Sequence, residues 1–327
     1  MKESDIRDTV VLDEYLAMVE KDIRDLFDPV SFEDVRCPAC SSSGHAREFE
    51  KSGFRYVSCK ECSTLFVNPR PTFEALNRFY SSSPSASFWV NRFFKPMALP
   101  RREKIFRPRA ERIAELIGAD KPFAVGDIGA GFGLFLEEMR SIMPRNSYLA
   151  IEPSYEMAGI CREKGLKVRR ECLEEIRDMD GHFDLLTAFE IMEHLHDPAD
   201  FVRKVHSLLK PKGRFFLTTL NGMGFDILML WARSKSVMPP HHLNFFNTSS
   251  VKKLLERAGF IVEEVSTPGK LDWDIVEKAI LSGAADPGRF WDFLARQGSQ
   301  AVKSRLQEWI AGNNLSSHMM IVARKGA

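Results

Sequence analysis

Three glycines follow an acidic residue at the end of an apolar run, and this arrangement can hold a ligand against the main chain. The run at 123–125 leads to Asp127, and the glycines are Gly129, Gly131 and Gly133. Glycine tolerates backbone angles closed to other residues and leaves no side chain in the way of a ligand. A dinucleotide-binding turn requires its third glycine three places after the second, but position 134 is leucine. The spacing therefore argues against a bound dinucleotide.

Two later apolar runs also end in a carboxylate. The next run along the chain ends at Glu152, and the run at 183–189 is followed by Glu190. A carboxylate after the second strand of a parallel sheet can accept hydrogen bonds from both ribose hydroxyls of a nucleoside ligand. A helical pattern at 201–209 and a strand pattern at 214–220 come next. This order predicts alternating strands and helices with acids at the strand ends.

In this order, the glycine loop and the segments that follow it resemble the core of class I S-adenosylmethionine (SAM) methyltransferases. The resemblance implies an α/β fold with a Rossmann-like seven-stranded sheet whose last strand is antiparallel. The sixth strand is then expected at 260–265 and the seventh at 317–323. Another nucleotide-binding α/β domain is the alternative.

The same resemblance implies which residues contact SAM. The loop and the acid before it are expected along the methionine and ribose parts, Glu152 at the ribose hydroxyls, and the end of the fourth strand near the sulfonium. The expected cofactor-binding residues are Asp127, Gly129, Gly131, Gly133, Glu152, Phe189 and Glu190. For Phe189, packing within the strand is an alternative role. The stretch at 171–176 is expected to line the adenine.

Four of the six cysteines form two pairs with the spacing of a structural zinc site. The expected ligands are Cys37, Cys40, Cys59 and Cys62. Four thiolates close a tetrahedron around Zn²⁺ and leave no position for water, so the metal would be structural. The segment between the pairs has too few apolar residues to hold itself together without a staple. Two disulfides are the alternative, which a reducing compartment disfavours.

The chain is expected to divide around these two signals. Apolar residues at helical spacing predict an amphipathic helix within 1–30, packed on the core or on a partner subunit. A zinc-ribbon module at 31–70 ends at two prolines, and a helical cap or linker follows at 71–112. The methyltransferase domain covers 113–327, with a helical insertion at about 268–316. In the family that it resembles, such an insertion usually serves as a substrate lid or a dimer surface, so a homodimer is one expected assembly.

Methyl transfer to an alcohol requires a base for the departing proton, and histidine titrates near neutral pH. His241 and His242 stand on a proline-stiffened loop after the fifth strand, a position that commonly faces the acceptor pocket in this fold. They are the preferred catalytic candidates, and His194 is a third. The alternative is that they brace the loop.

The segment Glu190-x-x-Glu193-His194 resembles ubiquinone-pathway O-methyltransferases, in which such residues hold a divalent cation beside the acceptor. The resemblance implies a second divalent cation at Glu190, Glu193 and His194, in addition to the structural zinc. The alternative is that Glu193 and His194 orient the start of the following helix.

Residues 91–112 contain eight basic side chains and two acidic ones. The basic residues are Arg92, Lys95, Arg101, Arg102, Lys104, Arg107, Arg109 and Arg112. One interpretation is a cap that binds a phosphate or carboxylate on an anionic acceptor. Other interpretations are RNA binding and a solvated helix with paired charges.

Over about 35–325, the chain resembles bacterial zinc-binding methyltransferases of the type-23 family, which are often linked to cell-surface glycan modification. The resemblance implies a SAM-dependent enzyme that methylates a small acceptor, and the expected target is an oxygen of a sugar, nucleotide-linked sugar or related metabolite. The rival is an RNA base methyltransferase that uses its zinc ribbon to bind RNA. A net charge of +1 disfavours a general polyanion binder, so nucleic acid is the less expected partner.

The start of the chain is polar and lacks the apolar stretch of a signal peptide. No apolar run approaches the roughly 18 residues that span a membrane. We therefore expect a cytoplasmic protein without membrane insertion.

Overall fold

The computed structural model describes residues 2–6, 8–118 and 121–326. Position 7 of the predicted N-terminal helical segment, positions 119 and 120 of the predicted methyltransferase domain, and the two end residues lie outside the described residues. Within the described ranges, no helix is both long and apolar enough to cross a membrane.

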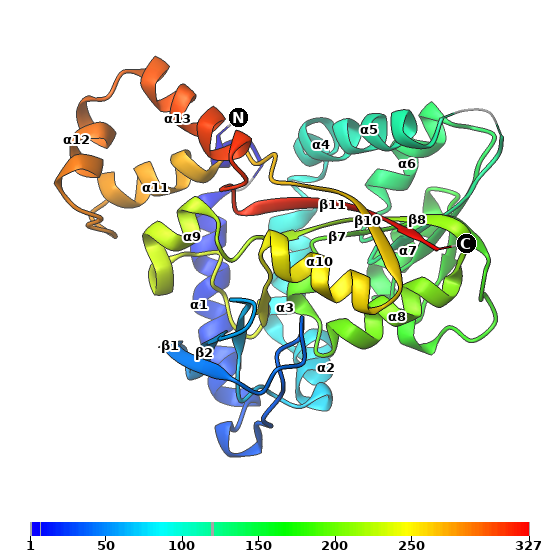
Figure 1. Cartoon of the computed structure of the whole chain (residues 1–327), viewed down its shortest axis with the longest axis horizontal. Helices are drawn as coiled ribbons and strands as arrows, with labels where there is room; N and C mark the ends of the chain where they lie inside the picture. The colour runs from blue at the N-terminus through cyan, green and yellow to red at the C-terminus, as the bar shows by residue number, and fades with distance from the viewer. Residues whose placement is uncertain (1, 7, 119–120, 327) are drawn as a thin grey trace.

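A seven-stranded sheet forms the centre of the molecule, in the order β10-β11-β8-β7-β4-β5-β6 (Figure 1). Its strands are β4 (Ala124–Ile128), β5 (Ser147–Ile151), β6 (Lys167–Arg169), β7 (Phe183–Phe189), β8 (Leu209–Leu220), β10 (Phe260–Ser266) and β11 (His318–Lys325). Neighbours from β6 to β8 pair in parallel, whereas β11 is antiparallel to both β8 and β10. The predicted Rossmann-like sheet with an antiparallel last strand is confirmed.

Amphipathic helices cover both faces of this sheet (Figure 1). They are α5 (Arg107–Ile117), α6 (Leu134–Ile142), α7 (Tyr155–Glu163), α8 (Pro198–Leu208) and α10 (Thr248–Arg257). Apolar side chains of α5, α6 and α7 pack with one set of strand residues, and those of α8 and α10 pack with another. Helix α8 begins where it does because Pro198 occupies its first turn and the Asp197 side chain accepts two backbone N–H bonds.

A second, four-stranded sheet joins the cysteine segment to the core. It has the order β1 (His45–Lys51), β2 (Phe54–Cys59), β3 (Leu65–Val67) and β9 (Asn244–Phe245). The last of these strands comes from the loop that carries His241 and His242. The segment at 31–70 therefore completes its sheet with a strand from the methyltransferase part of the chain.

Helix α1 (Thr9–Leu26) lies against this second sheet and the helical segment after it. Asp8 caps the helix by accepting from Val10 N and Val11 N, so Ile6 lies outside it. The next helical elements are α2 (Phe73–Ser82), α3 (Pro84–Phe88), the π-helical turn η3 (Trp89–Phe94), α4 (Ala98–Arg101) and the π-helical turn η4 (Arg102–Phe106). One apolar cluster contains residues of α1, α2, η3 and the second sheet, so these parts share a core.

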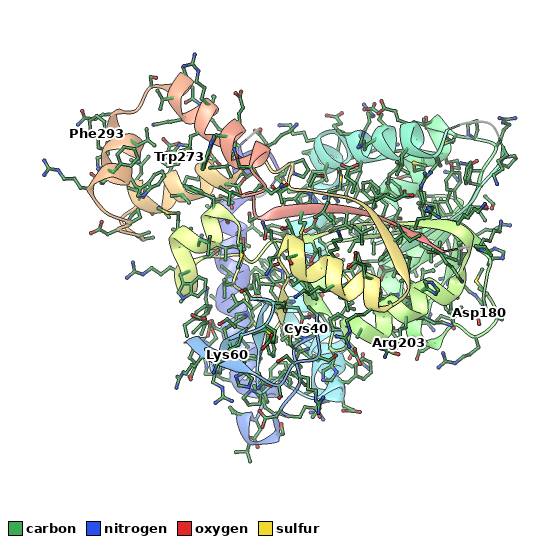
Figure 2. The ribbon with its side chains drawn as sticks, in the orientation of Figure 1. Cys40, Lys60, Asp180, Arg203, Trp273 and Phe293 are labelled. Carbon is green, nitrogen blue, oxygen red and sulfur yellow. The ribbon has the colours of Figure 1, made fainter. Side chains whose placement is uncertain are left out.

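The helical insertion between β10 and β11 extends away from the sheet (Figure 1). It consists of α11 (Asp272–Leu281), α12 (Arg289–Gln297) and α13 (Gln300–Gly312), and it packs on α9 (Phe225–Leu230). Trp273 lies among these helices, whereas Phe293 points outward at the edge of the molecule (Figure 2).

Two buried aspartates lie where the insertion joins the core. Asp272 accepts hydrogen bonds from Ser316 Oγ and Ser317 N, both at 2.7 Å. Among the described residues, no group makes a hydrogen bond of good geometry to either carboxylate oxygen of Asp226. Burial and the nearby Asp272 charge raise the pKa of Asp226 to about 7, although the Ser317 hydroxyl offsets part of this shift. Asp226 therefore makes folding sensitive to pH.

We predict that Asp226→Asn removes a pH-dependent loss of stability. The pKa of Asp226 rises from 3.8 to about 7 on folding, so ionisation destabilises the native protein progressively as the pH rises through this range. The free energy of unfolding of the variant minus that of wild type should therefore be on the order of 2 to 3 kcal/mol larger at pH 8 than at pH 5. Urea unfolding at both pH values measures this, with the exposed Asp286→Asn as control. Equal pH dependence in Asp226→Asn and wild type would contradict the prediction.

Candidate active site

The glycine loop connects β4 to α6 and is built from left-handed backbone. Gly129, Gly131 and Gly133 have φ values of +65°, +56° and +69°, which other residues rarely adopt. A Cβ atom on Gly129 would lie 2.5 Å from Ile191 Cδ1, and one on Gly133 would lie 2.5 Å from Leu166 Cδ1. Nothing lies within 4 Å of the corresponding position on Gly131. The loop is thus packed at both ends and open at its middle glycine.

Two buried carboxylates lie beside this loop at the ends of adjacent strands. Asp127 accepts a hydrogen bond from Thr187 Oγ1 at 2.6 Å, and burial raises its pKa to about 7. Glu152 accepts from Gly131 N at 2.8 Å and from Ser154 N at 2.9 Å, while burial raises its pKa. Their positions agree with the predicted strand ends.

Glu190 lies at the next strand end and is surrounded by donors. Its Oε1 accepts from Arg109 Nη2 at 3.0 Å and from Thr218 Oγ1 at 2.7 Å, and it lies 3.3 Å from His318 Nδ1. Burial alone would raise the pKa of Glu190, but His318 and Arg109 lower it to about 2. The carboxylate is therefore ionised at neutral pH.

Phe189 packs beside this ion pair. Its ring lies 4.8 Å from that of Phe135, and the Arg109 guanidinium lies 4.9 Å from its centroid. One face of the ring therefore carries a cation–π contact within the protein.

Glu193, His194 and His242 form a three-residue group of potential metal ligands. One donor atom of each lies within 4.8 Å of the others. His194 Nδ1 lies 3.0 Å from His241 O, and His242 Nδ1 lies 2.5 Å from Ser236 O. A carbonyl oxygen can only accept, so both Nδ1 atoms carry a proton.

This group differs from the predicted cation ligands in one member. The predicted ligands were Glu190, Glu193 and His194. In the structure, Glu190 forms an ion pair with Arg109, and His242 lies beside Glu193 and His194. Burial and the Glu190 charge raise the pKa of Glu193, whose Oε2 accepts from Thr219 Oγ1 at 2.8 Å.

His241, the other preferred base, lies in an aromatic enclosure. Its Nε2 shares a 2.6 Å hydrogen bond with the Tyr15 hydroxyl, and the rings of Phe79 and Tyr80 lie 5.0 and 5.5 Å from its own. Burial lowers the pKa of His241 well below 6.5. Its side chain therefore joins the N-terminal helix to the histidine loop.

The basic segment is largely neutralised within the chain. Ion pairs link Lys95 to Glu156, Arg102 to Glu137 and Glu138, Lys104 to Asp5, Arg107 to Glu138, Arg109 to Glu190, and Arg112 to Glu264. Six of the eight cations thus have acidic partners, as the paired-charge interpretation expects.

The four paired cysteines meet in one cluster. The Sγ atoms of Cys37 and Cys62 are 3.5 Å apart, as are those of Cys40 and Cys59, and all four lie within 4.8 Å of one another. All four are free thiols. Hydrogen bonds from Cys37 and Thr64 help to lower the pKa of Cys62 to about 4 against the opposing effect of burial.

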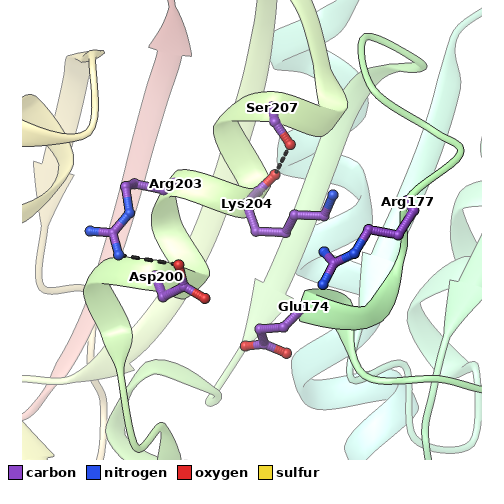
Figure 3. A pocket seen from close by; sticks show the side chains of 6 residues that line it. All are labelled: Glu174, Arg177, Asp200, Arg203, Lys204 and Ser207. Carbon is purple, nitrogen blue, oxygen red and sulfur yellow. Dashed lines mark hydrogen bonds and ion pairs between the residues drawn. The ribbon is translucent and has the colours of Figure 1, made fainter.

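A surface hollow of about 390 Å³ lies over α8 (Figure 3). Its lining side chains have mixed charge: Glu174, Arg177, Asp200, Arg203, Lys204 and Ser207. Arg203 turns toward Asp200 within it (Figure 3). None of these residues was predicted to contact cofactor or acceptor, except that Glu174 belongs to the stretch expected near the adenine.

Comparison with protein families identifies this arrangement. The sequence model of a family described as a methyltransferase domain matches residues 101–265, just over half of the chain. The chain belongs to this methyltransferase family. Its strand order and glycine loop agree with the fold of class I SAM-dependent methyltransferases.

Curated relatives of the methyltransferase include enzymes named for oxygen methylation. It is 32% identical over 165 residues to the ubiquinone biosynthesis O-methyltransferase of Xanthomonas euvesicatoria pv. vesicatoria (strain 85-10), a match that covers 46% of this chain and 66% of the relative. The protein of the same name from Ruegeria pomeroyi is 27% identical over 198 residues, covering 53% of this chain and 79% of the relative. The chain spans slightly less than two thirds of the length of the first of these.

A solved structure shares the fold. It is a complex between the Haloferax volcanii Trm112 methyltransferase activator and a methyltransferase, with a TM-score of 0.51 and 14% identity, covering 73% of this chain and 96% of the matched one. At this identity, the likeness shows the fold alone.

Sequence reasoning did not find several residues of the methyltransferase site. Arg109 was counted within the basic segment but not placed at Glu190, and His318 was only the start of a predicted strand. Tyr15 and Tyr80 belong to helices far from the glycine loop in sequence. Only the folded chain brings these four side chains to Glu190 and His241.

We predict that His194 and His241 remain neutral throughout the physiological pH range. Burial lowers the pKa of His194 to about 4 and that of His241 below 6.5, so both rings should titrate only under acidic conditions. Because unfolded histidine binds protons more readily, both groups reduce stability as the pH falls below about 6.5. NMR titration of the histidine ring resonances tests this, with assignment by His194→Asn and His241→Asn. A midpoint near 6.5 for either ring would contradict the prediction.

Proposed function

We propose that this methyltransferase transfers the methyl group of SAM to a hydroxyl oxygen of a small acceptor. The observation that carries the proposal is the meeting of the open glycine loop, two buried carboxylates and the ionised Glu190 at one edge of the sheet. The names of the curated relatives support oxygen as the methylated atom.

The cofactor-binding residues are those that the sequence suggested. Asp127 faces the amino-acid part of SAM, the loop glycines lie along its methionine and ribose parts, and Glu152 accepts from the ribose hydroxyls. An ionised Glu190 and the Phe189 ring suit a neighbouring sulfonium, because both attract positive charge. Arg109 pairs with Glu190 and lies over one face of the Phe189 ring, so it fixes the positions of these two side chains.

The four cysteines hold a structural zinc ion. A tetrahedral Zn–S bond of about 2.3 Å places sulfur atoms roughly 3.8 Å apart, close to the 3.5 Å separations of the two Sγ pairs. Thiolate is the form of cysteine that binds Zn²⁺.

His194 and His242 serve the acceptor side of the reaction. SAM carries an activated methyl group, so the enzyme must align the acceptor, exclude water and remove the hydroxyl proton. An imidazole can take this proton, although burial lowers the pKa of His194 to about 4 and makes that ring a weak base. With Glu193, His194 and His242 can also hold a divalent cation through one donor atom each. Such a cation would lower the pKa of an acceptor hydroxyl. His241 is a weaker candidate for the base, because its Nε2 is bonded to Tyr15.

A sugar, nucleotide-linked sugar or related metabolite is our preferred acceptor. The rival acceptor, RNA, would favour a basic module. Residues 31–70 contain six basic and five acidic side chains, and most of the basic segment is paired internally.

We predict that Gly131→Arg abolishes SAM binding, because the new side chain would fill the only open glycine of the loop. Affinity measured by calorimetry should fall at least about 100-fold, a differential of several kcal/mol. Gly181→Arg is the matched control, since Gly181 also has a left-handed φ, +65°, with nothing within 4 Å. Equal binding by wild type and Gly131→Arg would contradict the cofactor assignment.

The same proteins test the acceptor with radiolabelled SAM. Methyl transfer to nucleotide-linked sugars by wild type and Gly181→Arg, and not by Gly131→Arg, is the expected result. Transfer to ribosomal or transfer RNA, with RNA binding that weakens steeply in salt, would favour the rival.

We predict that Mn²⁺ binds at Glu193, His194 and His242. Calorimetric titration of the zinc-loaded protein should show one further site, weakened about 10- to 100-fold in His242→Ala because one direct ligand is lost. Glu190→Gln is the comparison variant, since Glu190 bonds to Arg109. Because the Glu190 charge raises the pKa of Glu193, this substitution should leave Mn²⁺ affinity unchanged or increase it. Loss of the site in Glu190→Gln but not in His242→Ala would restore the ligand set predicted from sequence. Absence of Mn²⁺ binding would assign the histidines to proton transfer alone.

A further inference from the structure

The cysteine module and the two histidine-bearing loops are joined by backbone pairing. Strand β3 pairs with β9, with Leu65 opposite Phe245 and Phe66 opposite Asn244. The ladder continues through Val67 N, which donates to Leu243 O at 2.9 Å. The module therefore supplies β3 as the strand with which the chain pairs immediately after His241 and His242.

The loop at 239–247, which carries His241 and His242, is hydrogen-bonded to the loop at 191–197, which carries His194. Leu243 N donates to Glu193 O at 2.8 Å, and the Asn244 side-chain amide donates to Met192 O and Leu195 O at 3.3 and 2.7 Å. These bonds fix the backbone on both sides of Glu193 and His194.

Arg70 lies where the module and both loops meet. It is 1% exposed, and its guanidinium donates to Val67 O, His196 O and Asn244 Oδ1 at 3.3, 2.7 and 3.1 Å. These acceptors are neutral and come from three separate segments. A buried charge held by neutral acceptors carries a large desolvation cost, so its main effect is to specify the relative positions of these segments.

Two further bonds connect the module to the histidine loop and its neighbour. The Tyr56 hydroxyl donates to His242 O at 2.9 Å. The Asn247 amide donates to Cys62 O at 2.8 Å, and the Asn247 carbonyl oxygen caps α10. Cys62 of the cluster is thus hydrogen-bonded directly to Asn247, the last residue of the loop at 239–247.

We infer that the cysteine module positions the acceptor-side histidine loops, with Arg70 as the positioning residue that joins them. This rests on the proposed function for the meaning of "acceptor side", but not for the physical coupling itself. The module then acts within its own chain. Occupancy of the cysteine cluster governs residues 191–197 and 239–247 and leaves the SAM loop at 127–133 in place.

Hydrogen exchange on the full-length, zinc-loaded protein tests this inference through Arg70→Lys. Lysine keeps the charge but cannot make three divergent bonds, so exchange at 191–197 and 239–247 should become about tenfold faster. Zinc content and SAM affinity should stay at wild-type values. The His194 and His242 ring resonances should shift in the same variant.

Arg257→Lys is the matched control. Arg257 also binds the module, through Ala39 O at 3.1 Å and Ser41 Oγ at 2.8 Å, and its hydrogen bonds within the described part of the chain do not include either histidine loop. Its substitution should leave exchange in both loops unchanged. Equal effects of the two lysine variants would overturn the inference, as would unchanged loops in Arg70→Lys.

Tyr56→Phe and zinc chelation provide independent tests should Arg70→Lys fail to fold. Removing one hydroxyl should accelerate exchange at 239–247 only, and chelation should release both loops before residues 127–133. Loops that stay protected in either experiment would overturn the inference. Failure of wild type to bind SAM or transfer methyl groups would instead overturn the proposed function, because exchange is measured without SAM.

Discussion

Parallel pairing of β4 with β5 and β7 is the constraint on which the site depends. Parallel strands end at the same edge of a sheet, so Asp127, Glu152 and Glu190 come together although they are widely separated in sequence. The left-handed glycine loop turns the chain from β4 into α6 without covering this edge. Every other group of the site is placed relative to these three carboxylates.

Clustered buried acids must be neutralised, and this site uses two different solutions. Asp127 accepts its hydrogen bond from the neutral Thr187 hydroxyl, and burial raises its pKa to about 7. Glu190 has Arg109, His318 and Thr218 around it and remains ionised. The same edge of one sheet therefore offers a carboxylate that can exchange a proton near neutral pH and one that stays charged.

The second sheet is completed by backbone pairing between the cysteine module and the core. β3 would be an exposed edge, but β9 covers it, and the partner strand follows the histidine pair directly. The cysteine cluster and the core thus share hydrogen bonds as well as apolar contacts. This explains why a module that is recognisable by its cysteines in sequence is not structurally separate.

Local patterns determined where the strands lie along the chain, the glycine loop, the Asp127 and Glu152 positions and the cysteine pairs, because each rests on spacing between nearby residues. The arrangement of the strands in the sheet was implied by the family resemblance. Periodicity could not reveal that Arg109 and His318 would meet Glu190, or that His242 would replace Glu190 beside Glu193 and His194. These are contacts between distant segments, and they depend on how helices and loops pack over the sheet. The sequence by itself determined which residue types are available to bind a ligand, and only the tertiary structure decided which charged and aromatic side chains surround them.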